Sequence, residues 1–127
     1  MVEFPYGTKS LLCKYLSADL WKRYQGRRDK VGVPFEQMIL SGCQNVDSGI
    51  GVYAGSHDAY YTFEGLFDRI IEDYHGHAKN DRHVSDMDYT KLNCPPFTEE
   101  EKSMIISTRI RVGRNLAAFP LGPGITK

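Results

Sequence analysis

The sequence predicts a mainly α-helical domain followed by the first strand of a second domain. Three observations support this prediction. Apolar residues recur every three or four positions in residues 10–24, 35–42 and 57–74, a long polar stretch covers residues 75–103, and β-branched residues alternate in residues 104–112. Helical spacing places apolar side chains on one face of a helix, whereas alternation places them on one face of a strand.

The first helical segment lies within residues 10–24. Its apolar residues are Leu11, Leu12, Tyr15, Leu16, Leu20, Trp21 and Tyr24. Ser17 is a suitable N-cap for the second part of this segment, because a serine hydroxyl can accept a hydrogen bond from a backbone N–H of the first turn. The polar residues 25–30 are expected to form a loop.

Two further helical segments follow. A short helix is expected at residues 35–42, directly after Pro34, with Phe35, Met38 and Ile39 on its buried side. Residues 57–74 show the clearest helical pattern and predict either one helix or two helices that meet near Gly65. Gly76 is the expected stop, because glycine readily adopts the left-handed backbone that ends many helices.

The composition changes after this segment. Residues 75–103 are rich in Asp, Lys, His, Asn and Pro, and polar stretches of this length inside a small domain are usually linkers or functional segments. The alternating residues 104–112 predict a strand, which cannot be stable without neighbouring strands. We therefore expect residues 1–90 to form a small all-helical domain, residues 91–103 a linker, and residues 104–127 the start of a second domain whose remainder is absent.

Composition and charge exclude several classes of protein. The 127 residues contain 16 Lys+Arg and 16 Asp+Glu, so the formal net charge is zero, and a histone-like nucleic-acid partner is not expected. No apolar run reaches the roughly 18–20 residues that span a bilayer, and no signal peptide is visible. Cys13, Cys43 and Cys94 lie far apart, which favours a reducing, cytoplasmic location over disulfides or a structural zinc site.

The predicted strand presents arginines on one face. Ser107, Arg109 and Arg111 alternate with apolar residues, so their side chains would share a face. Two guanidinium groups about 6–7 Å apart suit contacts with successive phosphate groups. The alternative is a solvated strand face whose arginines keep an edge soluble.

A glycine-rich loop covers residues 47–55. Gly49, Gly51 and Ala54 match the dinucleotide-binding spacing, but that motif must follow a buried strand and open a helix, and this loop does neither. Glycines can also turn successive backbone N–H groups toward an anion, and the Tyr53 hydroxyl could contribute. The alternative is a tight turn that only connects two helices.

The histidines do not predict a metal site. His75, His77, Asp81 and His83 are irregularly spaced, and no regular element would hold three of them in tetrahedral geometry. A helix that ends at a polar loop explains them, with His75 near the negative end of the helix dipole.

Taken together, residues 11–16, 45–55, 66–76 and 106–114 resemble the N-terminal part of the phosphagen (ATP:guanidino) kinases, most closely the arginine-kinase-like branch. The resemblance covers nearly the whole chain. It implies a small all-helical N-terminal domain joined to a larger α+β catalytic domain built on an antiparallel sheet, so that the predicted strand is the first strand of that domain. The reaction implied is the reversible transfer of the ATP γ-phosphoryl group to a guanidino substrate for energy buffering.

The resemblance also implies roles for single residues. Backbone groups of Ser48, Gly49, Ile50 and Gly51, with the Tyr53 hydroxyl, would hold the carboxylate end of the guanidino substrate. The residues implied at the ATP site are Ser107, Arg109 and Arg111. Asp47 would pair with an arginine of the large domain when the enzyme closes, and Mg²⁺ would be held through ATP or ADP rather than by the protein.

The chain departs from the family pattern at two places. Residues 54–56 read Ala-Gly-Ser where arginine-kinase-like members usually have Ala-Pro-Asp, and residues 67–69 read Phe-Asp-Arg instead of Phe-Asp-Pro. We expect the first departure to loosen the exit of the glycine loop. The guanidinium-binding glutamates, the reactive cysteine and the other phosphate-binding arginines belong to the missing domain, so no catalytic residue is expected in this chain and no activity from it alone.

The sequence leaves two alternatives open. L-Arginine is the expected substrate, with taurocyamine and lombricine as the other candidates. A non-catalytic helical module for binding or dimerisation is the alternative to an enzyme fragment.

Overall fold

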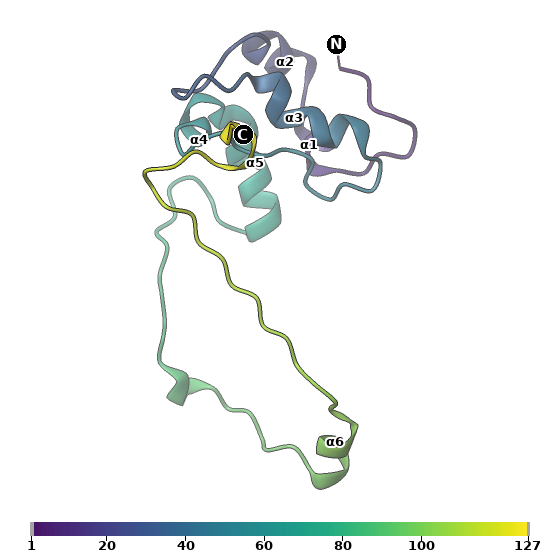
Figure 1. Ribbon diagram of the computed structural model, residues 1–127, viewed down its shortest axis with the longest axis vertical. Helices are drawn as coiled ribbons and strands as arrows, with labels where there is room; N and C mark the ends of the chain where they lie inside the picture. Colours follow the sequence, from purple (N-terminus) through teal and green to yellow (C-terminus); the bar gives the residue numbers. More distant parts are fainter. Residues whose placement is uncertain (1, 127) are drawn as a thin grey trace. The chain divides into compact units, whose positions relative to one another are not determined.

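The computed structural model describes residues 2–126. The chain divides into two compact units: Met1–Asp81 together with Asn115–Lys127, and Arg82–Arg114. The first unit contains five α-helices, in agreement with the predicted all-helical domain: α1 (Leu11–Tyr15), α2 (Ala18–Tyr24), α3 (Phe35–Gln44), α4 (Ala59–Thr62) and α5 (Glu64–His75) (Figure 1). The chain returns to this unit at its C-terminal end, where Gly122–Gly124 form the 3₁₀ turn η2.

The predicted helical segments and their caps are confirmed. Residues 10–24 form two helices, and Ser17 caps the second as predicted, because its Oγ accepts from the Leu20 amide at 3.2 Å. Ser10, which was not predicted as a cap, caps the first, and its Oγ accepts from the Cys13 amide at 3.1 Å. The segment at residues 57–74 is broken at Phe63, two residues before Gly65. Gly76 ends α5 with a φ of 63°, in the left-handed region.

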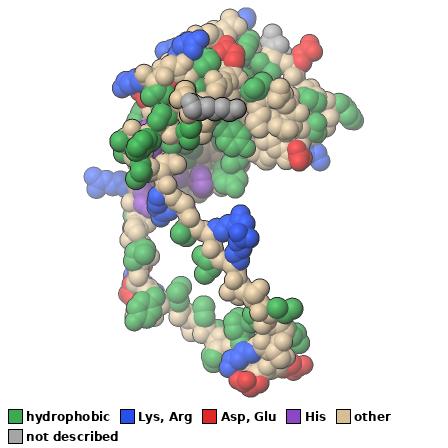
Figure 2. Space-filling model, in the orientation of Figure 1, with side chains coloured by type: hydrophobic (Ala, Val, Ile, Leu, Met, Phe, Trp, Pro, Cys, Tyr) green, Lys and Arg blue, Asp and Glu red, His purple; other side chains and the backbone are tan. Residues whose placement is uncertain are grey.

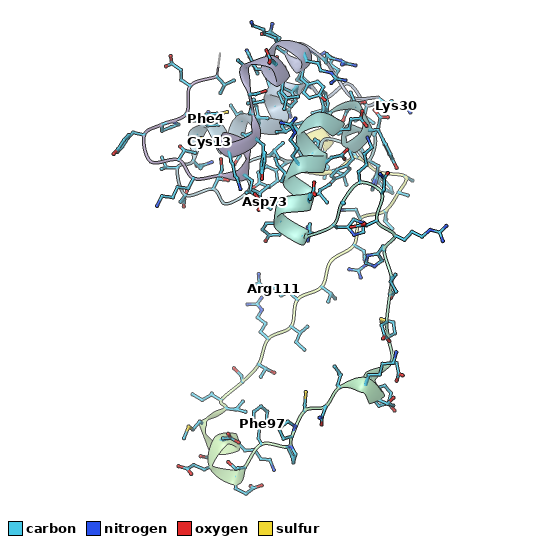
Figure 3. All side chains as sticks on the ribbon, turned by 180° about the vertical axis from the view of Figure 1, so that it is seen from behind. Phe4, Cys13, Lys30, Asp73, Phe97 and Arg111 are labelled. Carbon is cyan, nitrogen blue, oxygen red and sulfur yellow. The ribbon has the colours of Figure 1, made fainter. Side chains whose placement is uncertain are left out.

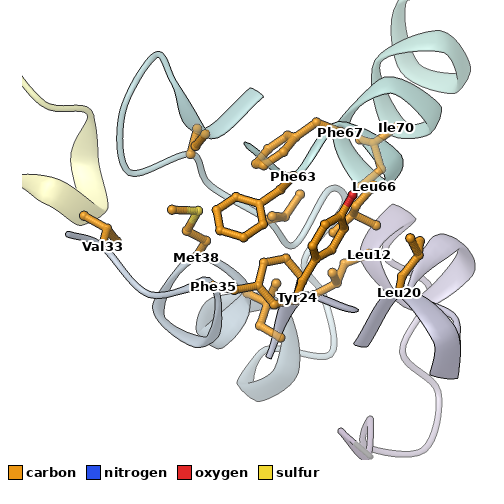
Figure 4. Close-up of a cluster of buried hydrophobic side chains, with 14 of the residues drawn as sticks. Leu12, Leu20, Tyr24, Val33, Phe35, Met38, Phe63, Leu66, Phe67 and Ile70 are labelled. Atoms are coloured by element: carbon orange, nitrogen blue, oxygen red, sulfur yellow. The ribbon is translucent and has the colours of Figure 1, made fainter. Parts of the chain in front are cut away.

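Three aromatic rings fill the centre of the helical unit. The ring centroids of Tyr24, Phe35 and Phe63 lie 5.1 to 5.5 Å apart, and all three side chains are fully buried (Figure 4). Each such burial contributes roughly 1.5–3 kcal/mol. Because the three rings come from α2, α3 and the junction of α4 with α5, they join the four helices into one core.

Packing explains the glycine in the first turn of α5. The Gly65 amide donates to the hydroxyl of Tyr24 at 2.9 Å, and a Cβ on Gly65 would lie 2.7 Å from that hydroxyl oxygen. Tyr24 is fully buried, so its hydroxyl needs a partner. Glycine at this position lets the first turn of α5 approach the tyrosine closely enough to provide one.

The second unit contains two short helical elements. These are the 3₁₀ turn η1 (Tyr89–Lys91) and the α-helix α6 (Glu99–Met104). Sequence reasoning missed α6, although Thr98 and Glu101 form a capping box in which each side chain accepts from the other residue's amide. This pattern, Ser or Thr followed three residues later by Glu, is the signal that could have found it.

The predicted strand at residues 104–112 is wrong for this chain. Met104 is the last residue of α6, and residues 105–112 are in neither a helix nor a strand. A strand requires backbone hydrogen bonds to a neighbouring strand, and the described part of the chain provides no such neighbour. None of the helices within residues 2–126 is both long enough and apolar enough to cross a membrane.

Candidate functional site

The glycine loop rests on the N-terminus of α1. The amides of Leu11 and Leu12 donate to the carbonyl oxygens of Gly49 and Ile50 at 3.0 and 2.9 Å. The first amides of a helix have no acceptor within the helix, so the loop satisfies donors that α1 would otherwise leave unpaired. This contact fixes the middle of the loop against a helix that is distant in sequence.

Gly51 is required by its surroundings. Its φ is +83°, and a Cβ added there would lie 3.1 Å from the Cα of Gly42 and 3.1 Å from the Cβ of Ser10. Gly42 lies in α3 and Ser10 caps α1, so the loop passes between the two helices with backbone nearly against backbone. A side chain at residue 51 would strain the loop and separate it from its supports.

Tyr53 is held in place through its backbone. Its amide donates to the carbonyl oxygen of Met38 in α3 at 2.9 Å, and its neighbours Val52 and Ala54 are buried. The Tyr53 side chain is 51% exposed. The loop therefore presents the tyrosine to solvent from a backbone that is anchored on both sides.

The amides and carbonyls of the loop are used differently. Two loop carbonyls accept from α1, whereas the amides of Gly49, Ile50 and Gly51 donate to no other group among residues 2–126. Ser48 differs from them, because its amide donates to the carbonyl oxygen of Asn45 at 3.2 Å within a turn. Three consecutive amides thus lack an acceptor within the described residues, and backbone amides are donors that can hold a carboxylate. Gly49 is exposed, Ile50 is half-buried and Gly51 is buried.

A cavity of about 520 Å³ lies beside Tyr53. This volume is in the range of small-molecule sites. Its lining includes the aromatic side chains of Tyr53, Tyr60, Tyr74 and Phe67 and the imidazole of His75. The glycine loop, α4, α5 and residues 115–123 all contribute to its walls, so the cavity is formed within the helical unit.

Helix α1 is also tied to α5 beside this cavity. One carboxylate oxygen of Asp73 accepts from Lys14 Nζ at 2.6 Å and from the Tyr15 hydroxyl at 2.7 Å (Figure 3). These hydrogen bonds hold the pKa of the Asp73 carboxyl below its ordinary value, and the bond to Asp73 raises the pKa of Lys14. The residue after Asp73 is Tyr74, so the tie fixes the part of α5 that lines the cavity.

The predicted phosphate-binding residues lie in the second unit. Ser107, Arg109 and Arg111 are exposed and follow α6 directly, and Figure 3 shows the Arg111 side chain standing clear of its own backbone. Neither arginine makes an ion pair with any group in the described part of the chain. Their nucleotide contacts therefore stay predictions.

Two other expectations concern single polar groups. Asp47, the predicted partner of an arginine of the large domain, is exposed, and its pairing stays a prediction. His75 is the last residue of α5, as expected from the sequence, and its ring lies edge-on to Tyr74 with centroids 4.8 Å apart. Within residues 2–126, no group of three or more His, Cys, Asp or Glu side chains is placed to hold a metal ion.

Sequence reasoning missed the supports of the glycine loop. Ser10 was the available signal for the start of α1, because serine is a common N-cap. The first amides of a helix need acceptors from outside it, and here the glycine loop provides them. The packing of residues 115–124 on the helical unit was not predicted. The alternating residues 104–112 suggested a strand, so the whole segment 104–127 was expected to belong to a second domain. Of the apolar residues in this segment, Leu121 packs on the helical core, whereas Phe119 is exposed.

Comparison with known proteins gives consistent matches. The family model described as ATP:guanido phosphotransferase, N-terminal domain, matches residues 6–72. The arginine kinase of Anthopleura japonica is 42% identical over 120 residues, which are 94% of this chain and 17% of that protein. The arginine kinase of Penaeus japonicus is 40% identical over 120 residues, or 94% of this chain and 34% of the relative.

Solved structures match part of the chain. A lombricine kinase crystal structure aligns with a TM-score of 0.61 at 27% identity, over 74% of this chain and 26% of that one. The duplicated taurocyamine kinase from Schistosoma mansoni aligns with a TM-score of 0.54 at 30% identity, over 57% of this chain and 10% of that one. The chain thus spans about a third of these proteins or less.

Proposed function

The chain belongs to the ATP:guanido phosphotransferase family, whose N-terminal domain it contains. We propose that it is the N-terminal part of an ATP:guanidino phosphotransferase and that it selects the guanidino substrate. The complete enzyme would transfer the ATP γ-phosphoryl group reversibly to a guanidino nitrogen. The oxygen–phosphorus bond to ADP breaks as a nitrogen–phosphorus bond forms, and the guanidino group loses a proton. Groups of the catalytic domain would accept that proton.

The glycine loop is the observation that supports this proposal most directly. Its carbonyls are occupied by α1 while the amides of Gly49, Ile50 and Gly51 remain unused within the described chain. A substrate carboxylate bound here would supply the acceptor that these amides lack within the described chain. Tyr53, exposed beside the cavity, would add a hydroxyl at the same end of the substrate.

The second contribution of the chain is positive charge for the nucleotide. Arg109 and Arg111 would contact the ATP phosphates, with Ser107 beside them. Mg²⁺ would arrive bound to those phosphates and would reduce their negative charge. Phosphoryl transfer depends mainly on alignment and charge neutralisation, so this chain would position both substrates while the catalytic domain completes the site.

We propose L-arginine as the guanidino substrate. Two relatives at 40% identity or more bear the name arginine kinase, and residues 74–76 resemble the arginine branch. The structural matches bear the names of lombricine and taurocyamine kinases, so those two compounds are the alternatives to test. A cytoplasmic location fits a reaction that consumes and restores ATP, and it forms part of the proposal.

The experiment joins residues 1–127 to the part of the Penaeus japonicus arginine kinase that follows its matched region. A coupled ATP assay then measures transfer to L-arginine, taurocyamine and lombricine. We expect turnover with L-arginine to exceed turnover with the other two, and no turnover by residues 1–127 alone. A folded chimaera that transfers phosphate to none of the three would refute the proposal, and activity of the isolated chain would refute the need for a catalytic domain.

The nucleotide role has its own test in the same chimaera. Arg109→Ala and Arg111→Ala each remove a charged hydrogen-bond donor, which typically costs about 1.5–3 kcal/mol and so roughly 10- to 100-fold in affinity. We expect the KM for ATP to rise by that factor. Arg69→Ala, at an exposed position on α5, is the matched control. Equal effects of all three variants would contradict the assignment.

A further inference from the structure

Residues 115–124, called the strap below, dock on the exit of the glycine loop. The Leu121 amide donates to the carbonyl oxygen of Gly55 at 3.0 Å, and the Leu121 side chain, 9% exposed, joins the hydrophobic core. Gln37 of α3 donates from Nε2 to the Pro123 carbonyl oxygen at 2.7 Å. The strap is therefore attached to the helical unit through the loop itself and through α3.

Gly55 has no free space on either side. A Cβ at this position would lie 2.6 Å from the Cβ of Val33, which is buried and whose amide donates to Asp29 Oδ1 at 2.8 Å. On the side of the strap, a Cβ on Gly124 would overlap the Gly55 carbonyl oxygen. Gly55 is thus enclosed between the turn at residues 29–33 and the strap.

This packing overturns the expectation that glycine at residue 55 loosens the loop exit. Glycine by itself allows the widest range of backbone conformations, whereas the proline usual at this position in the family would fix φ. Here the restriction comes from tertiary contacts, namely Val33 on one side and Leu121 on the other. Tyr53 is only two residues before Gly55, so a change at the exit would be transmitted to the tyrosine.

We propose that the strap is a latch that positions the substrate loop, and that Leu121, acting through Gly55, is its positioning residue. The part of the loop next to α1 is fixed by Leu11 and Leu12, whereas the exit at Gly55 is held by Val33 on one side and by the latch on the other. The functional meaning of the latch rests on the proposed role of the loop in binding a guanidino substrate. Its structural part stands on the contacts alone.

The test measures amide hydrogen exchange by NMR on the 127-residue chain. Leu121→Ala removes the anchor, Leu121→Met restores an apolar side chain of similar volume, and Leu116→Ala alters an exposed leucine of the same strap as a matched control. The reporters are the Tyr53 amide, bonded to Met38, and the Phe67 amide, bonded to Phe63. The second reporter follows the stability of the helical core.

We expect Leu121→Ala to accelerate exchange at Tyr53 at least tenfold more than at Phe67, with both other variants within threefold of wild type. Parallel acceleration at both amides would show that Leu121 contributes only to global stability, and an unchanged Tyr53 amide would show that the loop does not depend on the strap. Either result overturns the proposal. The exchange rates of these two amides are measured without a ligand and without turnover. A failure of the latch proposal can therefore be distinguished from a failure of the proposed function.

The chimaera described above adds the functional measurement. We expect Leu121→Ala to raise the KM for the guanidino substrate at least threefold while kcat stays within twofold, because a displaced loop weakens binding without touching the reacting atoms. A fall in kcat with unchanged KM would overturn the positioning role. Leu121→Met should have a KM close to that of wild type, because methionine fills a similar volume in the core.

Discussion

At the scale of single residues, the glycine loop is shaped by close backbone contacts more than by the chemistry of its own side chains. Gly51 adopts a positive φ between Gly42 and Ser10, whereas a Cβ added to Gly49, two residues earlier, would have no neighbouring atom within 4 Å. The two glycines therefore have different roles. Gly51 allows the loop backbone to pass close to α3 and to the N-cap of α1, whereas Gly49 is exposed and has no such neighbour.

This difference gives a prediction for alanine substitution. Gly51→Ala should destabilise the chain by about 1–3 kcal/mol, because alanine at a positive φ is strained and its methyl group would contact Gly42 and Ser10 too closely. Gly49→Ala should change stability by less than about 0.5 kcal/mol. Urea unfolding followed by circular dichroism measures both. Equal destabilisation by the two variants would contradict the packing described for Gly51.

At the scale of elements, short helices are held by contacts between elements that lie far apart in sequence. Helix α1 has only 5 residues, too few to be stable alone in water. It is kept in place by the glycine loop at its N-terminus and by Asp73 of α5 near its C-terminus. The fit between α2 and α5 depends in the same way on one glycine beside one tyrosine hydroxyl.

The tie between α1 and α5 predicts a pH dependence. Lys14 and Tyr15 lower the pKa of Asp73, so the stabilisation is present above the ordinary carboxyl pKa and is lost as pH falls through the lowered value. The pKa of Lys14 is raised, so its part is present below the ordinary lysine pKa and is lost as pH rises through the raised value. Asp73→Asn should therefore lower the urea midpoint most near neutral pH.

Unfolding midpoints of wild type and Asp73→Asn across the pH range check this prediction. The difference between them should shrink toward strongly acidic and strongly alkaline pH. Glu72→Gln is the matched control, because the neighbouring Glu72 is exposed on the same helix and has no ion-pair partner among the described residues. A pH-independent difference for Asp73→Asn would show that the charge is not involved.

Replacing Gly65 with alanine should destabilise the protein, although Gly→Ala substitutions inside helices usually stabilise. Gly→Ala inside a helix normally stabilises by roughly 0.5–1 kcal/mol, but a methyl group on Gly65 would lie 2.7 Å from the buried Tyr24 hydroxyl and 3.1 Å from Leu20 Cδ2. We expect Gly65→Ala to cost about 1–3 kcal/mol. In a Tyr24→Phe background, without the hydroxyl, the cost should be smaller.

A double-mutant cycle on the free energy of unfolding measures this coupling. It compares wild type, the two single variants and the double variant under the same conditions. If Gly65→Ala costs the same in both backgrounds, the tyrosine hydroxyl is not what requires glycine at residue 65.

At the scale of the whole molecule, the sequence predicted elements that are stabilised locally and failed where stability comes from distant contacts. The helices of the first unit were predictable because apolar spacing and the caps Ser17 and Gly76 act within a few residues. The glycine loop was predicted as a site, but its supports by α1 and by Leu121 were not, since both contacts join residues that are far apart in sequence. Residues 105–112 have the composition of a strand, yet pairing needs neighbouring strands, and residues 2–126 contain none.

The second unit has many apolar side chains in contact with solvent. Every residue from 79 to 119 is exposed, and these include Phe97, Ile106, Ile110 and Val112 at 60% or more. Figure 2 shows hydrophobic side chains and basic side chains open to solvent along this part of the chain. So much exposed apolar surface is unusual for a soluble protein and indicates a surface that another part of a protein covers, which is the role proposed for the catalytic domain.

Limited proteolysis tests this role of the second unit. Trypsin should cut the isolated chain early after Arg109, Arg111 and Arg114, as well as after Arg82, because these arginines are exposed and outside regular structure, where backbone fits a protease site most easily. In the chimaera with the arginine kinase catalytic domain, residues 109–114 should pair with a sheet, and cleavage there should slow at least tenfold. Intact-mass measurements over time follow both reactions, with cleavage after Arg23 in α2 as the internal control. If cleavage within residues 109–114 is equally fast in both proteins, the catalytic domain does not cover this segment, and the arginines would not be held in the orientation that nucleotide binding requires.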